Sequence, residues 1–332
     1  MSTGKLLATR GYVVGIEISS SGARQSVALA DLNGNILHRR CRSLDDVPDT
    51  KTALSLIDEM LLDLTRADRL EDGRILRVGV AVGGLVDAAQ GVVRTLHHAH
   101  GWDNFPLQDY FASRLDRPCI IDNNANAAAL AEIQQGTGKG ERIVLYVGIG
   151  RGIGGALVVN GKVYHGITCM AGEIGHMLVQ ENGPQCSCGG FGHLEAVASA
   201  RAIEQAMIQL AAEYPVTDAA IKRITQGHTE NLKAEQVFYL ASDGDKIAQQ
   251  LVDQVYRYLS IALTNIVHLV NPSMIILGGS VTQVGELFIT PLQAHMQQLC
   301  LPAAYQSLRV VRGSLESEAN LVGAVTLALQ DL

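Results

Sequence analysis

The chain has 332 residues, of which 47% are hydrophobic and 18% charged, and 26 basic against 33 acidic side chains give a net charge of −7. This length predicts two domains or one large two-lobed unit. The composition excludes disorder, and no apolar stretch is long enough to span a bilayer. Residues 1–10 lack the apolar core of a secretory signal, so we expect a cytoplasmic protein without a membrane partner. The acidic charge argues against direct nucleic-acid binding by this chain.

Two similar series of elements succeed each other along the chain. Each begins with a β-meander that has glycine at its first turn and continues into helices, which predicts an internally duplicated α/β protein. Helical spacing of apolar residues predicts helices over 50–64 and 246–270. The predicted strands of both halves are 12–19, 25–31, 36–40, 75–82, 142–147, 156–160 and 274–277.

The halves are not separated by a low-complexity tract or a long linker. We predict an N-terminal α/β lobe over residues 1–124 and a larger C-terminal α/β lobe over 125–332. The larger lobe holds a loop rich in cysteine and histidine and a helical region that we expect to mediate dimerisation.

Glycine-containing turns come after three of the predicted strands, at 19–22, 148–155 and 278–279. Backbone N–H groups in such turns can approach phosphate oxygens, so together they predict a nucleotide site, although each alone could be an ordinary turn. The candidate contacts are Gly150, Gly152, Gly154, Gly278 and Gly279. The run Ser19-Ser20-Ser21 and the bulky Arg151 suit this task poorly, so we expect a degenerate ATP site.

A short glycine-rich stretch holds two cysteines and two histidines, namely His176, Cys186, Cys188 and His193. Two thiolates and two imidazoles form a closed tetrahedral set that suits structural zinc. The alternative is a pair of unrelated surface histidines beside two reducible cysteines. Glu173 and Glu195 flank the stretch and could accept hydrogen bonds from sugar hydroxyls, or they could be solvated residues at helix starts.

Segments spread over nearly the whole chain together resemble the ROK family (repressors, open reading frames and sugar kinases). The segments are 101–102, 104–107, 121–132, 172–176, 186–195 and 271–279. The resemblance implies an actin-like, ribonuclease-H-like duplicated two-lobed ATPase fold and a sugar cleft. It also implies structural zinc and a homodimer or homotetramer.

The resemblance also implies roles for individual residues. Sugar contacts fall on Gly84, Asn123, Asn124, Glu173, His176 and Glu195, and zinc ligands on His176, Cys186, Cys188 and His193. The family usually has a cysteine at the position of His193, but imidazole is an acceptable zinc ligand. His176 would then bind zinc through one ring nitrogen and a sugar hydroxyl through the other.

The most informative departure from the family is Asn124. In the kinases that the chain resembles, the motif reads Asn-Asp-Ala-Asn, and its aspartate takes the proton from the sugar hydroxyl; here the sequence is Asn123-Asn124-Ala125-Asn126. An amide cannot accept that proton, and losing a general base typically costs about 10²–10⁴-fold in rate. It can still hydrogen-bond a sugar. Asp122 is one position away, so its side chain is expected to point elsewhere.

These departures predict a sugar-binding protein without catalytic residues. We interpret it as the sugar-sensing and oligomerisation part of a transcriptional regulator, closest to N-acetylglucosamine-repressor-like members. Residues 5–15 and 27–34 look like the junction and first hairpin of repressor-type members, yet no winged-helix domain fits before Tyr12. One alternative is an ATP-dependent hexose or N-acetylhexosamine kinase, similar to glucokinases. Another is a purely structural zinc protein.

Overall fold

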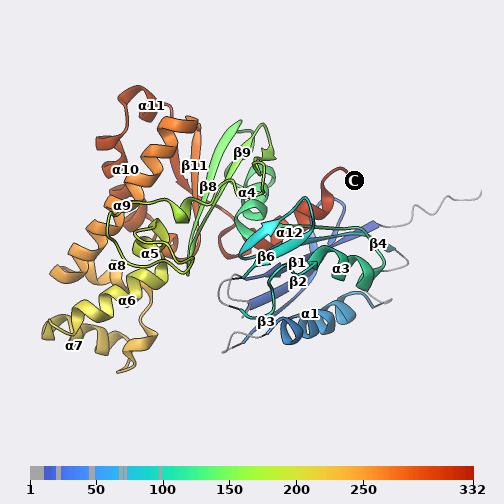
Figure 1. The fold of residues 1–332 in the computed structure, drawn as a ribbon, viewed down its shortest axis with the longest axis horizontal. Coiled ribbons are helices and arrows are strands. Elements are labelled where there is room, and N and C mark those ends of the chain that lie inside the picture. The colour runs from blue at the N-terminus through green and yellow to red at the C-terminus, as the bar shows by residue number, and fades with distance from the viewer. Residues whose placement is uncertain (1–10, 20–23, 45–48, 67–69, 71–72, 97–98) are drawn as a thin grey trace, which may run out of the picture. The chain divides into compact units, whose positions relative to one another are not determined.

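The computed structural model describes residues 11–19, 24–44, 49–66, 70, 73–96 and 99–332 (Figure 1). These residues form two compact units. The first consists of the described part of Met1–Ala131 together with Gly166–Met170 and Glu318–Leu332. The second consists of Glu132–His165 and Ala171–Ser317. None of the helices in the described part of the chain is long and apolar enough to cross a membrane.

The first unit is built on a five-stranded sheet with the order β3-β2-β1-β4-β7. Its strands are β1 (Gly11–Ile18), β2 (Arg24–Asp31), β3 (Ile36–Ser43), β4 (Arg74–Val82) and β7 (Cys119–Asn123). The first three form an antiparallel meander, whereas β4 and β7 run parallel to β1. A separate two-stranded ribbon pairs β5 (Leu85–Asp87) with β6 (Val92–Thr95). The continuous apolar run of β1 is explained by burial of both faces of this central strand.

The helices that accompany this sheet include α1 (Thr50–Leu64), α3 (Leu107–Leu115) and α12 (Ala319–Leu329). Helix α1 begins where Asp49 accepts a hydrogen bond from the backbone of Thr52, and its buried residues recur at helical spacing. The helix coincides with the prediction for 50–64. Helix α12 comes from the end of the chain, and Val325 packs with Val13 and Ala28 of the sheet. Its backbone lies so close to Gly79 that a Cβ atom there would overlap Ala324 O.

The second unit contains another five-stranded sheet, with the order β10-β9-β8-β11-β12. Its strands are β8 (Ile143–Ile149), β9 (Ile153–Val159), β10 (Lys162–Val163), β11 (Met274–Gly278) and β12 (Arg309–Arg312). Again the first three strands in chain order form an antiparallel meander, and the last two run parallel to β8. The two sheets therefore share one strand order and one pattern of directions. This confirms the predicted duplication and the actin-like α/β fold class.

Most helices belong to the second unit. They are α5 (Leu194–Ala198), α6 (Ala200–Ala211), α7 (Pro215–Ile224), α8 (Ala234–Ser242), α9 (Lys246–Val270), α10 (Glu286–Leu299) and α11 (Pro302–Gln306). Short 3-10 turns occur at η1 (Ile174–His176), η2 (Thr229–Asn231), η3 (Ser280–Val284) and, near the unit boundary, η4 (Glu316–Glu318). Helix α9 has the predicted bounds, because Asp245 caps its first turn and Asn271 ends it in a left-handed conformation.

Candidate functional site

The first group of candidate residues lies where β7 ends and helix α4 (Asn124–Gln134) begins. Asn123 Nδ2 donates to Gly84 O at 2.7 Å, and Asn123 Oδ1 accepts from the backbone N–H of Ala125 at 2.7 Å. Gly84 has a φ of +85°, and a Cβ atom there would overlap Thr95 O, so the position requires glycine. The structure thus brings Gly84 and Asn123 together through a hydrogen bond from the Asn123 side chain to the Gly84 backbone.

Of the two polar groups of the Asn124 side chain, only the amide nitrogen has a hydrogen-bond partner among the described residues. Its Nδ2 donates to Ile18 O, the last residue of β1, at 3.2 Å. Its Oδ1 is buried and has no hydrogen-bond partner among the residues that the structure describes. A buried acceptor without a donor is costly, so this oxygen is well suited to a hydroxyl group of a ligand. An aspartate here would instead face the Ile18 carbonyl oxygen with a carboxylate.

The neighbouring Asp122 is engaged elsewhere. Its side chain is only 3% exposed, and Oδ1 accepts from Asn126 Nδ2 at 2.8 Å and from the backbone N–H of Asn123 at 2.7 Å. Asn126 lies in the first turn of α4, and Asn123 is the residue before that helix. The carboxylate therefore organises the junction of strand and helix from within.

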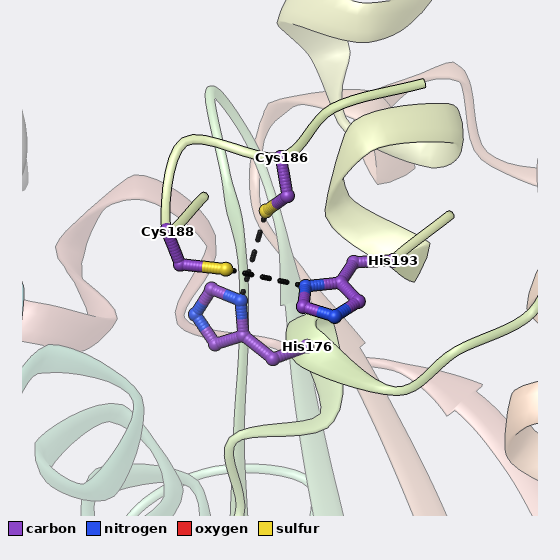
Figure 2. Close-up of side chains that lie close together, drawn as sticks. All are labelled: His176, Cys186, Cys188 and His193. Atoms are coloured by element: carbon purple, nitrogen blue, oxygen red, sulfur yellow. Dashed lines mark hydrogen bonds between the residues drawn. The ribbon is translucent and has the colours of Figure 1, made fainter. Parts of the chain in front are cut away.

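The second group of candidates is the cysteine–histidine set, and Figure 2 shows its four side chains pointing toward one another. One ligand atom from each of the four residues lies within 4.8 Å of the others. Cys186 Sγ is 3.7 Å from His176 Nδ1, and Cys188 Sγ is 3.2 Å from His193 Nδ1. Tetrahedral zinc with bonds of about 2.3 Å to sulfur and about 2.0–2.1 Å to nitrogen requires a sulfur–nitrogen separation of about 3.6 Å. The donors present therefore fit zinc.

Residues 176–193, which we call the metal loop, are folded by backbone contacts and glycine. Bridges pair Leu178 with His193 and Gln185 with Phe191, which returns the chain toward His176. Gly190 leaves room for the ring of His193, because a Cβ atom there would overlap it. The loop ends where His193 precedes the first residue of α5.

His176 also lies close to a carboxylate. Its Nε2 is 3.9 Å from Glu173 Oε2, while its Nδ1 faces Cys186. Burial raises the pKa of Glu173 to about 7, and the nearby charge of Glu195 acts in the same direction. A carboxyl group at this position can accept hydrogen bonds from sugar hydroxyls.

The carboxylate of Glu195, by contrast, accepts hydrogen bonds from other residues of the protein. Its Oε2 accepts from the backbone N–H of Ile153 at 3.0 Å, and its Oε1 accepts from Ser187 Oγ at 3.0 Å. Neither donor was predicted, because neither Ser187 nor Ile153 carries a signal in the sequence. The predicted sugar contacts thus fall into two groups, with Gly84, Asn123 and Asn124 in the first unit and Glu173, His176 and Glu195 in the second.

The five candidate nucleotide-binding glycines lie at one end of the second sheet. Gly150 and Gly152 form the turn between β8 and β9, and Gly154 pairs with Gly148, which also pairs with Gly278. Gly279 has a φ of +90°, and a Cβ atom there would overlap Ile149 O, so packing alone requires this glycine. Arg151 is exposed in the turn.

Only the start of the serine turn in the first unit belongs to the described part of the chain. Ser19 N donates to Arg24 O at 3.0 Å, and Ser19 Oγ accepts from Arg24 N at 3.1 Å, which closes the connection from β1 to β2. Ser20, Ser21 and Gly22 lie outside the described residues.

The duplicated sheets, with glycine turns at strand ends, place the chain in the actin-like α/β fold class. Within this class the chain belongs to the ROK family, because the model of that family matches residues 13–331.

Known proteins resemble the chain over most of its length. A glucokinase of Halalkalibacterium halodurans is 33% identical over 77% of this chain and 77% of its own length. A putative xylose repressor of Caldicellulosiruptor sp. is 29% identical over 97% of this chain and 79% of its own length. The structure of a ROK family glucokinase from Streptomyces griseus, in complex with glucose and AMPPNP, has a TM-score of 0.82 and 27% identity, covering 96% of this chain and all of that one. The relatives therefore include both enzymes and regulators.

Proposed function

We propose that the protein is a sugar-binding effector part of a transcriptional regulator in which the kinase site is defective. The proposal rests on Asn124, which occupies the position of the proton-accepting aspartate in the kinases that the chain resembles. Its Nδ2 is engaged with Ile18 O, and its buried Oδ1 is a free acceptor among the described residues. This arrangement supports binding of a hydroxyl group but offers no base for its deprotonation.

The proposed sugar contacts are Gly84, Asn123 and Asn124 in the first unit, and Glu173, His176 and Glu195 in the second. Glu173 and His176 supply a carboxyl group and an imidazole that can receive hydroxyl groups. Zinc, when bound, would be held by His176, Cys186, Cys188 and His193 and would stabilise the loop, because all four tetrahedral positions are filled by the protein. His176 would then keep Nε2 for a sugar hydroxyl or for Glu173.

A sensor must convert binding into a change of conformation. Sugar that binds one conformation of the protein better than another shifts the population toward it, and a useful response needs a difference of about 1–3 kcal/mol. We further propose that the protein acts in the cytoplasm as a homodimer or homotetramer. DNA would be bound through a part other than the described units. The net negative charge of this chain is poorly suited to contacts with DNA phosphates.

A sugar kinase is the second candidate. It is favoured by the glucokinase of Halalkalibacterium halodurans, which is 33% identical to the chain. In this case the protein would phosphorylate a hexose or N-acetylhexosamine with ATP, and its base would differ from that of the kinases it resembles. Asn124→Asp would then raise turnover, and Asp122→Ala would abolish the existing activity.

Two measurements separate these candidates. In a thermal-shift screen of glucose, N-acetylglucosamine, fructose and xylose, each with and without ATP, we expect stabilisation by one of the sugars and none by ATP. In a coupled assay, we expect no ATP-dependent turnover of these sugars. Turnover of about 1 s⁻¹ or faster, which is typical of working enzymes, would establish the kinase and exclude the sensor.

A further inference from the structure

The metal loop and the turn between β8 and β9 meet at the side chain of Glu195. We call residues 149–153 the glycine turn. Glu195 Oε2 accepts from the backbone N–H of Ile153 at 3.0 Å. Gly152 lies so close to the same carboxylate that a Cβ atom would overlap Oε2. The other oxygen, Oε1, accepts from the hydroxyl of Ser187 at 3.0 Å.

The donor Ser187 and the acceptor Glu195 both lie beside candidate metal ligands. Ser187 lies between the two cysteines of the metal set, so ligation of Cys186 and Cys188 fixes the backbone on both sides of it. Glu195 itself comes two residues after His193, at the start of α5. Cys186 Sγ itself lies 3.9 Å from Glu195 Oε1, so a bound metal would fix the carboxylate together with Cys186 and Ser187.

A second contact ties the same helical corner to the glycine turn. The backbone N–H of Ala200, the first residue of α6, donates to Gly150 O at 2.7 Å. Helices α5 and α6 are joined at Ser199, whose N–H donates to Glu195 O at 3.3 Å. The metal loop, α5 and the glycine turn thus form one hydrogen-bonded unit.

We infer that Glu195 is a positioning residue that transmits the state of the metal loop to the glycine turn. With the metal bound, the Ser187–Glu195–Ile153 bridge holds the turn closed; without it, the carboxylate loses its fixed donor and the turn opens more often. Hydrogen bonds to a carboxylate are stronger than neutral ones, so their loss should be measurable at the turn. The inference depends on metal binding and not on whether the protein senses or phosphorylates sugar.

Arg151 provides a direct reporter of this opening, because it is exposed in the turn and precedes Gly152, which lies beside Glu195. Trypsin cleavage after Arg151, quantified by mass spectrometry, and hydrogen exchange of the Ile153 amide would be measured on full-length protein of known zinc content. Both would be repeated after zinc removal. We expect zinc removal to raise both rates about tenfold or more, as loss of a charged hydrogen bond would do.

The variants Glu195→Gln and Ser187→Ala test the bridge. We expect each to raise both rates in zinc-loaded protein, and Ser187→Thr, which keeps the hydroxyl, to restore slow cleavage. In Glu195→Gln, zinc removal should have little further effect, because the coupling has already been lost. Glu181→Gln is the matched control, since it removes an exposed carboxylate from the same metal loop.

Three results would overturn the inference: wild-type rates in both variants, an undiminished zinc effect in Glu195→Gln, or a chain that binds no zinc. A melting curve would show whether Glu195→Gln folds. If it does not, Ser187→Ala and Ser187→Thr still test the bridge, because Ser187 is exposed. The sugar thermal-shift screen is independent of these rates, so failure of the proposed function would be recognised separately.

Discussion

The two sheets have the same strand order but differ in the segments that connect their strands to the next helix. In the first unit, β7 passes directly into α4, and the candidate groups are the amides of Asn123 and Asn124. In the second sheet, β10 corresponds to β3, and the long connection from β10 to α5 carries the metal loop. Glu173 in this connection lies near the imidazole of His176, and Glu195 of α5 contacts the glycine turn. The comparison teaches that a duplicated scaffold fixes where strands end, whereas the connections decide the chemistry there.

The largest expected effect concerns Gly79, which lies in β4 of the first sheet. Gly79→Val in β4 would drive a side chain into the backbone of α12, because even a Cβ atom overlaps Ala324 O. We expect a loss of more than about 4 kcal/mol in the free energy of unfolding, measured by chemical denaturation. Gly150→Ala is the control, since nothing lies within 4 Å of a Cβ atom there. Equal losses in both variants would contradict the packing described for α12.

Zinc removal should distinguish the two units. At a free zinc concentration about a hundredfold above Kd, binding stabilises the folded state by about 2.7 kcal/mol, and a chelator removes that amount. We expect faster hydrogen exchange in the metal loop, α5 and α6, and unchanged exchange in the first sheet. Cys186→Ser should reproduce the effect without chelator. Equal loss of protection in the first sheet would show that the metal stabilises more than its own unit.

A smaller effect is expected at the strand end of the first unit. Asn124→Ala removes the donor to Ile18 O and the buried acceptor Oδ1. We expect sugar affinity to fall about tenfold, since one good hydrogen bond to a ligand contributes about 1–1.5 kcal/mol. Calorimetry with the sugar found in the thermal-shift screen measures this. Unchanged affinity would remove Asn124 from the proposed site.

The smallest effect tests the β5–β6 ribbon of the first unit. The hydrogen bond from Arg94 on β6 to Asp87 on β5, at 2.7 Å, lowers the pKa of that carboxyl below its usual value. The contribution is present above the unfolded-state pKa of about 3.9 and is lost as pH falls through the lower, folded-state pKa. The stability difference between wild type and Asp87→Asn should therefore shrink as the pH is lowered toward about 3. Chemical denaturation at several pH values measures it, and a constant difference would contradict the assignment.

Local sequence patterns determined a large part of this protein. Apolar runs and glycine turns predicted the meanders of both halves, and apolar spacing predicted α1 and α9 with the bounds that the structure shows. The four candidate metal ligands could be recognised because they lie within one short loop, where spacing in the sequence limits spacing in the structure.

Only the tertiary structure decided the contacts between distant segments. Helix α12 packs on the first sheet although most of the chain separates the two, and periodicity shows an apolar face without showing its partner. In the same way, Asn124 meets Ile18 O and Glu195 meets Ile153 N–H, because backbone groups have no signature in the sequence. The sequence therefore determined the two meanders, helices α1 and α9 and the kind of ligand atoms. Tertiary folding decided which oxygens and nitrogens remain available to a ligand.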